Sequence, residues 1–134
     1  MKSLKTKICE YTLYESELNE GFYKNAGGMV RPTTKDELKN EIKIRLDRGQ
    51  TNLNDIDTSR ITDMSSMFYN CKALKTVGDI SGWDVSKVTH MSRMFYECKS
   101  FNQDISDWDV SKVKFKTYIF LNCPIKDEYK PKFK

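Results

Sequence analysis

The sequence predicts an α/β fold: a short solenoid of about three strand-helix repeats with an N-terminal hairpin and a capping helix. Segments 56–71, 83–98 and 108–123 align without a gap, and we call them the first, second and third copies. Their ends are offset by 27 and then 25 residues, and a period in the twenties is typical of leucine-rich-repeat-like arrays. Each copy also changes from an extended pattern to a helical period, which predicts one strand and one helix per repeat.

Four parts are predicted along the chain of 134 residues, a length that suits one domain. They are a β-rich extension (1–30), a capping helix (31–52), the three-repeat solenoid (53–123) and a basic C-terminal tail (124–134). In the extension, residues 8–14 are rich in β-forming side chains. Residues 21–23 are expected to pair with them as a short hairpin.

A helix that caps the array is predicted within 31–52. Thr34 followed by Glu37 forms a capping box at its start, and Gly49 marks its end. An apolar stripe should lie against the first copy, formed by Leu38, Ile42 and Leu46. The outer face should be charged, as a terminal cap requires, through Lys35, Lys39, Lys43 and Arg45.

The second half of each copy has apolar residues at i, i+3, i+4 and i+7, which predicts a short helix with Thr62 or Thr89 as its N-cap. A helix of about ten residues is unstable alone. We therefore interpret the stripe as core packed against the next copy, and not as a cofactor site. It comprises Met64, Met67, Phe68 and Cys71 in the first copy and Met91, Met94, Phe95 and Cys98 in the second.

Three of the four cysteines, Cys71, Cys98 and Cys123, occupy one position in successive copies. Neighbouring helices lie about 8–10 Å apart, which exceeds the roughly 7 Å limit on Cα separation in a disulfide. We therefore expect these three thiols to be reduced and buried, whereas Cys9 is unassigned. The sequence has no CxxC pair and His90 is its only histidine, so neither a metal nor a cofactor is predicted.

Composition and motifs exclude several classes of function. A net charge of +4 is too mild to indicate nucleic acid by itself, and no apolar run is long enough for membrane insertion. The sequence contains no catalytic triad pattern, glycine-rich phosphate loop or HExxH motif, so we do not predict an enzyme. Glutamates interrupt any leader-like segment, so we expect a cytoplasmic monomer as written, or a surface or secreted protein if a natural leader has been removed.

Two further columns of repeated residues have alternative interpretations. Asp57, Asp84 and Asp109 provide stacked carboxylates for calcium or, as we favour, close turns by accepting backbone N–H groups. Trp83 and Trp108 are either binding hot spots or, as we favour, repeated core positions.

The phrase DISxWDVSxVTxMxxMFYxC, which residues 79–98 match throughout and residues 104–123 match in part, resembles the repeat of the BspA-type leucine-rich-repeat surface proteins of bacteria, also called the mycoplasma-lipoprotein type. The lead-in TTKDELKNEI and the closing CPIKDEYKPKF also resemble this family, so the likeness covers roughly residues 31–134. It implies a curved repeat scaffold and surface display with adhesion to host proteins or matrix. The sequence as written is expected to depart from the family in having only three repeats and no recognisable leader peptide.

The third copy differs most from the others. Lys114, Phe115 and Lys116 replace the Thr-His-Met of the second copy, and lysines at the start of a helix oppose its macrodipole. Such a choice indicates either a functional site or a frayed terminal repeat with a solvated tail. The candidate partner-binding residues are Lys112, Lys114, Lys116, Lys87, Arg60, Arg93 and Tyr118.

The sequence therefore predicts a non-catalytic module that binds a protein partner through its repeat face. One alternative is an intracellular effector or inhibitor, for example a phage or mobile-element antagonist of a host defence protein. Another is a binder that competes with nucleic acid through the C-terminal lysines, which we do not favour. Salt dependence separates nucleic-acid binding from protein binding, because phosphate contacts weaken steeply as salt rises.

Overall fold

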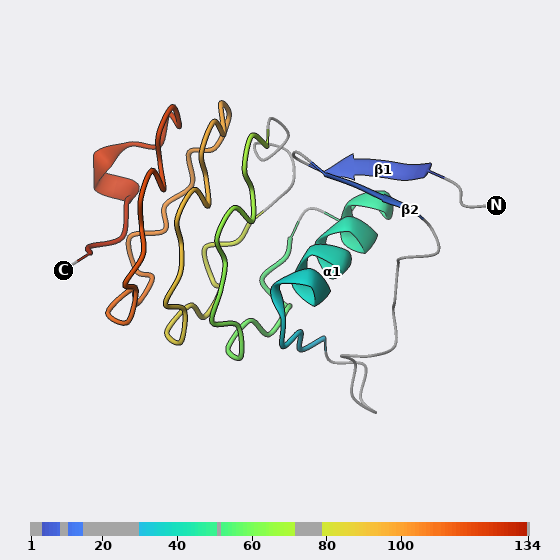
Figure 1. The fold of residues 1–134 in the computed structure, drawn as a ribbon, viewed down its shortest axis with the longest axis horizontal. Coiled ribbons are helices and arrows are strands. Elements are labelled where there is room, and N and C mark those ends of the chain that lie inside the picture. The colour runs from blue at the N-terminus through green and yellow to red at the C-terminus, as the bar shows by residue number, and fades with distance from the viewer. Residues whose placement is uncertain (1–3, 9–10, 15–29, 51, 72–78, 134) are drawn as a thin grey trace.

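A computed structural model describes residues 4–8, 11–14, 30–50, 52–71 and 79–133. Its elements in chain order are strands β1 (Leu4–Ile8) and β2 (Tyr11–Tyr14), helix α1 (Lys35–Asp47) and a 3-10 helix, η2 (Asp127–Tyr129). The three copies form coils stacked side by side, with α1 and the β1–β2 pair at one end and η2 at the other (Figure 1).

The predicted strand-helix solenoid is wrong. Within the described residues of the copies there is no helix, and strand-like pairing is limited to isolated parallel bridges between neighbouring copies. The stretch expected to be helical is instead a series of β-turns, in which N–H groups bond to the carbonyl three residues earlier. Three such turns in the second copy join Met94 to Met91, Tyr96 to Arg93 and Cys98 to Phe95.

Left-handed backbone at two equivalent positions of every copy explains why no helix forms. The φ angles there lie between 51° and 62°, a region that right-handed helices exclude and that costs an L-residue about 1 kcal/mol. None of these positions is occupied by glycine, so the sequence gives little sign of them. They are Ser66 and Asn70, Arg93 and Glu97, and Tyr118 and Asn122.

The backbone groups that a helix would have paired within itself join neighbouring copies. At the first junction the N–H groups of Met64, Ser66, Phe68 and Asn70 donate to the carbonyls of His90, Ser92, Met94 and Tyr96. At the second junction Met91, Arg93, Phe95 and Glu97 donate in the same way to Phe115, Thr117, Ile119 and Leu121. Every second N–H therefore points along the stack, as in a parallel sheet.

The predicted core stripe is confirmed even though its predicted helix is wrong. Met64, Met67, Phe68 and Cys71 are all at most 1% exposed, as are their counterparts in the second copy. The rings of Phe68, Phe95 and Phe120 stack through the core, with centroid separations of 5.5 and 5.6 Å. Consecutive turns can bury the same i, i+3, i+4, i+7 set as a helix, so this spacing alone did not distinguish the two.

Helix α1 is confirmed, including its cap. The Thr34 hydroxyl accepts the N–H of Glu37 at 3.1 Å, and the Glu37 carboxylate accepts the N–H of Thr33 at 2.8 Å. Leu38 and Ile42 are buried in the same core cluster as the copies. The helix therefore covers the open end of the first copy.

The predicted charged outer face of α1 is wrong at two positions, because Lys43 and Arg45 are buried. Lys43 forms an ion pair with Asp47 one turn later. Arg45 Nε donates to Glu41 Oε2, and its Nη1 donates to Asp55 Oδ1, both at 2.6 Å. Ion pairing compensates the desolvation of these charges, so charge alone did not mark the solvent face of the helix.

The N-terminal strands pair in a different way from the prediction. β1 pairs antiparallel with β2, with Ile8 opposite Tyr11, so residues 8–14 do not form one continuous strand. Residues 21–23, the predicted partner strand, lie outside the described residues. β1 also contacts α1.

The cysteines follow the prediction in part. Cys98 and Cys123 are free thiols, and burial raises the pKa of Cys98 to about 12. Cys71 is disulfide-bonded, which contradicts the expectation that it is reduced. The prediction considered only pairing between equivalent positions of the copies.

The C-terminal segment packs on the third copy and is not a solvated tail. Ile125 is buried, and the carbonyl of Tyr129 accepts the N–H of Ile105 at 3.0 Å. Lys130 lies over the ring of Phe120, with 5.6 Å between Nζ and the ring centroid. Residues 124–133 therefore cover part of the second open end of the stack.

Candidate interaction surface

The repeated aspartates close turns, as predicted. Asp57, Asp84 and Asp109 each accept the N–H of the serine two residues later at 2.9–3.0 Å. The hydroxyl and N–H of Ser86 both donate to Asp84 and hold the pKa of that carboxyl below its usual value. These carboxylates are engaged in backbone geometry, and among the described residues no group of three or more His, Cys, Asp or Glu side chains is arranged to hold a metal ion.

The two tryptophans belong to the core, as favoured from the sequence. Trp83 and Trp108 are 3% and 5% exposed. Their indole N–H groups donate to the carbonyls of Leu53 and Ser81, at 2.9 and 3.2 Å. Each indole therefore bonds to a backbone carbonyl from an earlier turn of the stack, and its ring is too buried to contact a ligand.

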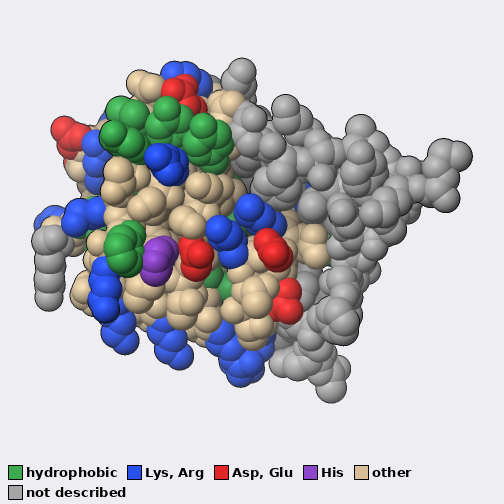
Figure 2. Space-filling view, viewed as in Figure 1, with side chains coloured by type: hydrophobic (Ala, Val, Ile, Leu, Met, Phe, Trp, Pro, Cys, Tyr) green, Lys and Arg blue, Asp and Glu red, His purple; other side chains and the backbone are tan. Residues whose placement is uncertain are grey.

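All seven residues proposed as partner-binding are exposed, but they do not form one patch. Three of them, Arg60, Lys87 and Lys112, occupy the same position in successive copies and form a basic column. Lys and Arg side chains line the lower edge of the face drawn in Figure 2. Arg93 and Tyr118 are a separate pair, with the guanidinium carbon 5.8 Å from the ring centroid.

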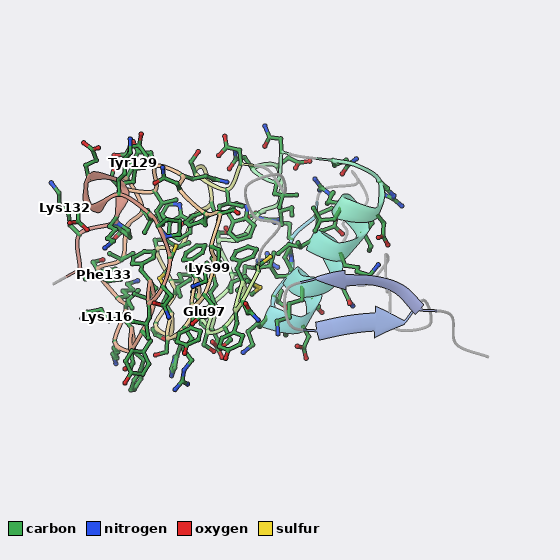
Figure 3. All side chains as sticks on the ribbon, turned by 90° about the horizontal axis from the view of Figure 1, so that it is seen from above. Glu97, Lys99, Lys116, Tyr129, Lys132 and Phe133 are labelled. Atoms are coloured by element: carbon green, nitrogen blue, oxygen red, sulfur yellow. The ribbon has the colours of Figure 1, made fainter. Side chains whose placement is uncertain are left out.

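The remaining two, Lys114 and Lys116, lie on the third copy. They were expected at the start of a helix, and that expectation is wrong because no helix is present there. Lys116 occupies the position that the buried Met64 and Met91 hold in the other copies. Its Nζ lies 5.7 Å from the ring centroid of Phe133, and Figure 3 shows both residues at the C-terminal end of the stack, with Tyr129 and Lys132 at the same end.

A second column, which the sequence reasoning missed as a surface, consists of Asp63, His90 and Phe115. Parallel bridges join these three residues across the copies. The rings of His90 and Phe115 stack, with centroids 4.4 Å apart. In Figure 2 the histidine lies between a hydrophobic and an acidic side chain.

Exposed apolar side chains concentrate on the third copy. The exposed large hydrophobic residues among those described are Phe115, Tyr118 and Leu121, at 51%, 54% and 42%. The second copy has His90, Arg93 and Tyr96 at these positions, of which two are charged or polar. Phe115 and Leu121 were not among the predicted contact residues, although comparing the aligned copies position by position would have found Phe115.

Charge also changes along the stack. The first copy has one arginine and two aspartates, for a net charge of −1, and the second copy is neutral with histidine uncharged. The third has three lysines and one aspartate, for a net charge of +2. The exposed apolar side chains therefore lie on the most basic copy.

A separate hollow of about 340 Å³ lies at the start of α1, lined by Thr33, Thr34, Lys35, Asp36, Thr62 and Asp63. It is open, and Lys35 Nζ lies 3.8 Å from Asp63 Oδ2 within it. No helix in the described part of the chain is long and apolar enough to cross a membrane.

Comparison with protein families found one match. The family model described as "Mycoplasma protein of unknown function, DUF285" matches residues 37–128. Comparisons with curated proteins and with solved structures found no significant match.

Proposed function

The chain belongs to the family described as "Mycoplasma protein of unknown function, DUF285", and we propose that it is a non-catalytic module that binds a protein partner through its third copy. The matched region includes most of α1, all three copies and the first half of the C-terminal segment. It also fits the resemblance to BspA-type repeats. The family description gives no activity, so the proposal rests on the surface.

The observation that carries this proposal is that the terminal copy exposes three large apolar side chains, and at two of these positions the preceding copy has a charged or polar side chain. A terminal repeat normally needs a polar outer face for solubility. Here Phe115, Tyr118 and Leu121 are each more than 40% exposed. Exposed apolar side chains rimmed by polar residues are typical of protein-protein contacts, and aromatic residues are enriched there.

The surrounding lysines support a partner with negative charge. Lys112, Lys114 and Lys116 are exposed on the same copy, and complementary charge speeds association and selects partners. Exposed lysines contribute less to affinity than buried aromatic contacts do. Serine at all three positions should therefore slow association and weaken its salt dependence more than it changes dissociation.

An exchange of surface residues between copies tests the proposal without changing the backbone. The variant F115H/Y118R/L121Y gives the third copy the side chains of the second, which has the same left-handed backbone at Arg93 as at Tyr118. The control, D63H/S66R, makes the same kind of exchange in the first copy. Each tagged protein is used to capture partners from a lysate, the captured protein is purified, and its Kd is measured by calorimetry.

We expect the third-copy variant to weaken binding by at least about tenfold, as for loss of an interface hot spot. The control should bind within about twofold of the wild type. Equal affinities for all three proteins would contradict the proposal. Retention that falls steeply between about 0.05 and 0.2 M salt, with nucleic acid in the eluate, would favour the electrostatic alternative instead.

A further inference from the structure

The backbone of the third copy presents an open edge. At both junctions between copies, four alternate N–H groups donate to the next copy. The equivalent four groups of the third copy have no hydrogen-bond acceptor among the described residues. They belong to Lys116, Tyr118, Phe120 and Asn122.

One acceptor accompanies these donors. The carbonyl of Thr62 accepts the N–H of Thr89, and the carbonyl of Thr89 accepts the N–H of Lys114, both at 2.8 Å. The equivalent carbonyl of the third copy is that of Lys114, and no described N–H donates to it. The edge therefore offers one acceptor followed by four donors at alternate residues, the pattern that each earlier copy uses to bind its neighbour.

The C-terminal segment covers the side-chain core at this end but leaves the backbone edge unpaired. Lys130 lies over Phe120, and Lys116 lies near Phe133. Among the described residues, the backbone hydrogen bond that joins residues 124–133 to an earlier part of the chain runs from the N–H of Ile105 to the carbonyl of Tyr129. It involves none of the four edge donors.

A second molecule of this protein does not fit the edge. The complementary carbonyl edge is that of the first copy, where Lys35 Nζ donates to the carbonyl of Ser65 at 3.3 Å and α1 covers the core. Head-to-tail stacking would require α1 to leave. Tail-to-tail stacking would bring two edges together that each have four donors and one acceptor, so most of the donors would have no acceptor.

The charges around the edge favour an acidic occupant. Lys114 and Lys116 belong to the edge residues themselves, and Lys112 and Lys132 are also exposed at this end. Unpaired edges of this kind accept an extended segment from another protein, with main-chain bonds giving affinity and side chains giving specificity. Carboxylates on such a segment would meet the lysines while its carbonyls meet the N–H groups.

We infer that the third copy binds an extended, acidic segment of a partner protein, which adds to the stack by accepting hydrogen bonds from the N–H groups of Lys116, Tyr118, Phe120 and Asn122. This inference rests on the proposed function and specifies the partner for the same surface. Phe115, Tyr118 and Leu121 would contact its side chains.

Amide hydrogen exchange with defined probes tests the inference on the whole chain. The probe is a synthetic 12-residue peptide of alternating Thr and Glu, and the control has Thr and Lys. A second control, polyacrylate, carries carboxylates without a peptide backbone. We expect the Thr-Glu peptide at saturation to slow exchange at the four edge amides by at least about tenfold, as new backbone bonds do. The Thr-Lys peptide and polyacrylate should leave their exchange unchanged.

Two results would overturn the inference. One is unchanged exchange at the four amides with the Thr-Glu peptide at millimolar concentration. The other is equal slowing by polyacrylate, which would show that charge alone is recognised. If either occurs while the F115H/Y118R/L121Y variant still loses its partner, the backbone inference fails and the proposed function stands. If that variant keeps its partner, the proposed function fails by itself.

Discussion

The second and third copies have the same series of backbone turns, but the second lies between two other copies and the third is the last copy of the stack. Arg93 and Tyr118 occupy equivalent left-handed positions, and both copies contain the same series of turns. Phe95 is fully buried between two neighbouring rings of the stack, whereas Phe120 is half-buried. The backbone of a copy is therefore set by its turns and by the alternate hydrogen bonds. Which of its side chains are exposed to solvent depends on its position in the stack.

The largest expected change in the free energy of unfolding comes from exchanging side chains at a position that is buried in the second copy and exposed in the third. Met91 is fully buried, whereas Lys116 at the equivalent position is exposed. Met91→Lys should lower the free energy of unfolding by about 3–5 kcal/mol or prevent folding, because it buries an ammonium group in the core. Lys116→Met should change it by less than about 0.5 kcal/mol. Urea unfolding measures both, and similar losses would contradict the assignment of inner and terminal copies.

Truncating the stacked rings should give a graded result. Phe95 contacts the rings of Phe68, Phe101 and Phe120, so Phe95→Ala should cost about 3–5 kcal/mol of unfolding free energy. Phe120→Ala removes a half-buried ring at the end of the stack and should cost about half as much. Chemical denaturation of the two variants measures the loss of unfolding free energy in each. A cost for Phe120→Ala equal to that for Phe95→Ala would show that the terminal core is as enclosed as the inner one.

A single glycine substitution separates turns from helices. Ser66 has φ of 55°, so Ser66→Gly should raise the free energy of unfolding by up to about 1 kcal/mol through relief of left-handed strain. In a helix the same change would lower it by about 0.5 kcal/mol, because glycine has the lower helix propensity. Ser100, which is not among the residues with positive φ, provides the matched control, and Ser100→Gly should not stabilise the protein. A loss of stability in Ser66→Gly would contradict the turn geometry.

The smallest expected effect is on the loss of thermal stability at low pH. Ser86 lowers the pKa of Asp84 through its hydroxyl and N–H, so the folded state favours the ionised carboxylate. This stability is present above the ordinary carboxyl pKa and is lost as pH falls below about 4, through the lowered pKa of the folded state. Ser86→Ala removes the 2.6 Å hydroxyl bond. Its Tm should fall less than that of the wild type between pH 5 and pH 3, measured by circular dichroism at about half-unit steps. Parallel Tm curves for the two proteins would contradict this role of Ser86.

The sequence revealed the repeat, its core stripe, the helix capped by Thr34 and the structural roles of Asp84 and Trp83. These features depend on residue type and spacing, which are visible in aligned copies. The sequence did not reveal the backbone of the copies, because left-handed angles at Ser66 and Glu97 involve no glycine. The same apolar spacing fits both a helix and a series of turns. The helix was predicted because it is the commoner of the two.

The candidate surface was predicted in part. Tyr118 and the lysines of the third copy were identified, but Phe115 and Leu121 were not, since their exposure follows from the turn geometry and from the end of the stack. The burial of Lys43 and Arg45 was also missed, because it depends on ion pairs with Asp47, Glu41 and Asp55. Sequence reasoning located the unusual copy but not the backbone edge that it presents.

The most direct test of the account is amide exchange in the free protein, compared between the second and third copies. The account predicts that the N–H groups of Met91, Arg93, Phe95 and Glu97, which bond to the next copy, exchange at least about tenfold more slowly than those of Lys116, Tyr118, Phe120 and Asn122. Residue-resolved NMR exchange at constant pH measures both sets in one experiment. Equal protection of the two sets would contradict the open edge, and with it the inference that an extended segment of a partner protein pairs with this edge.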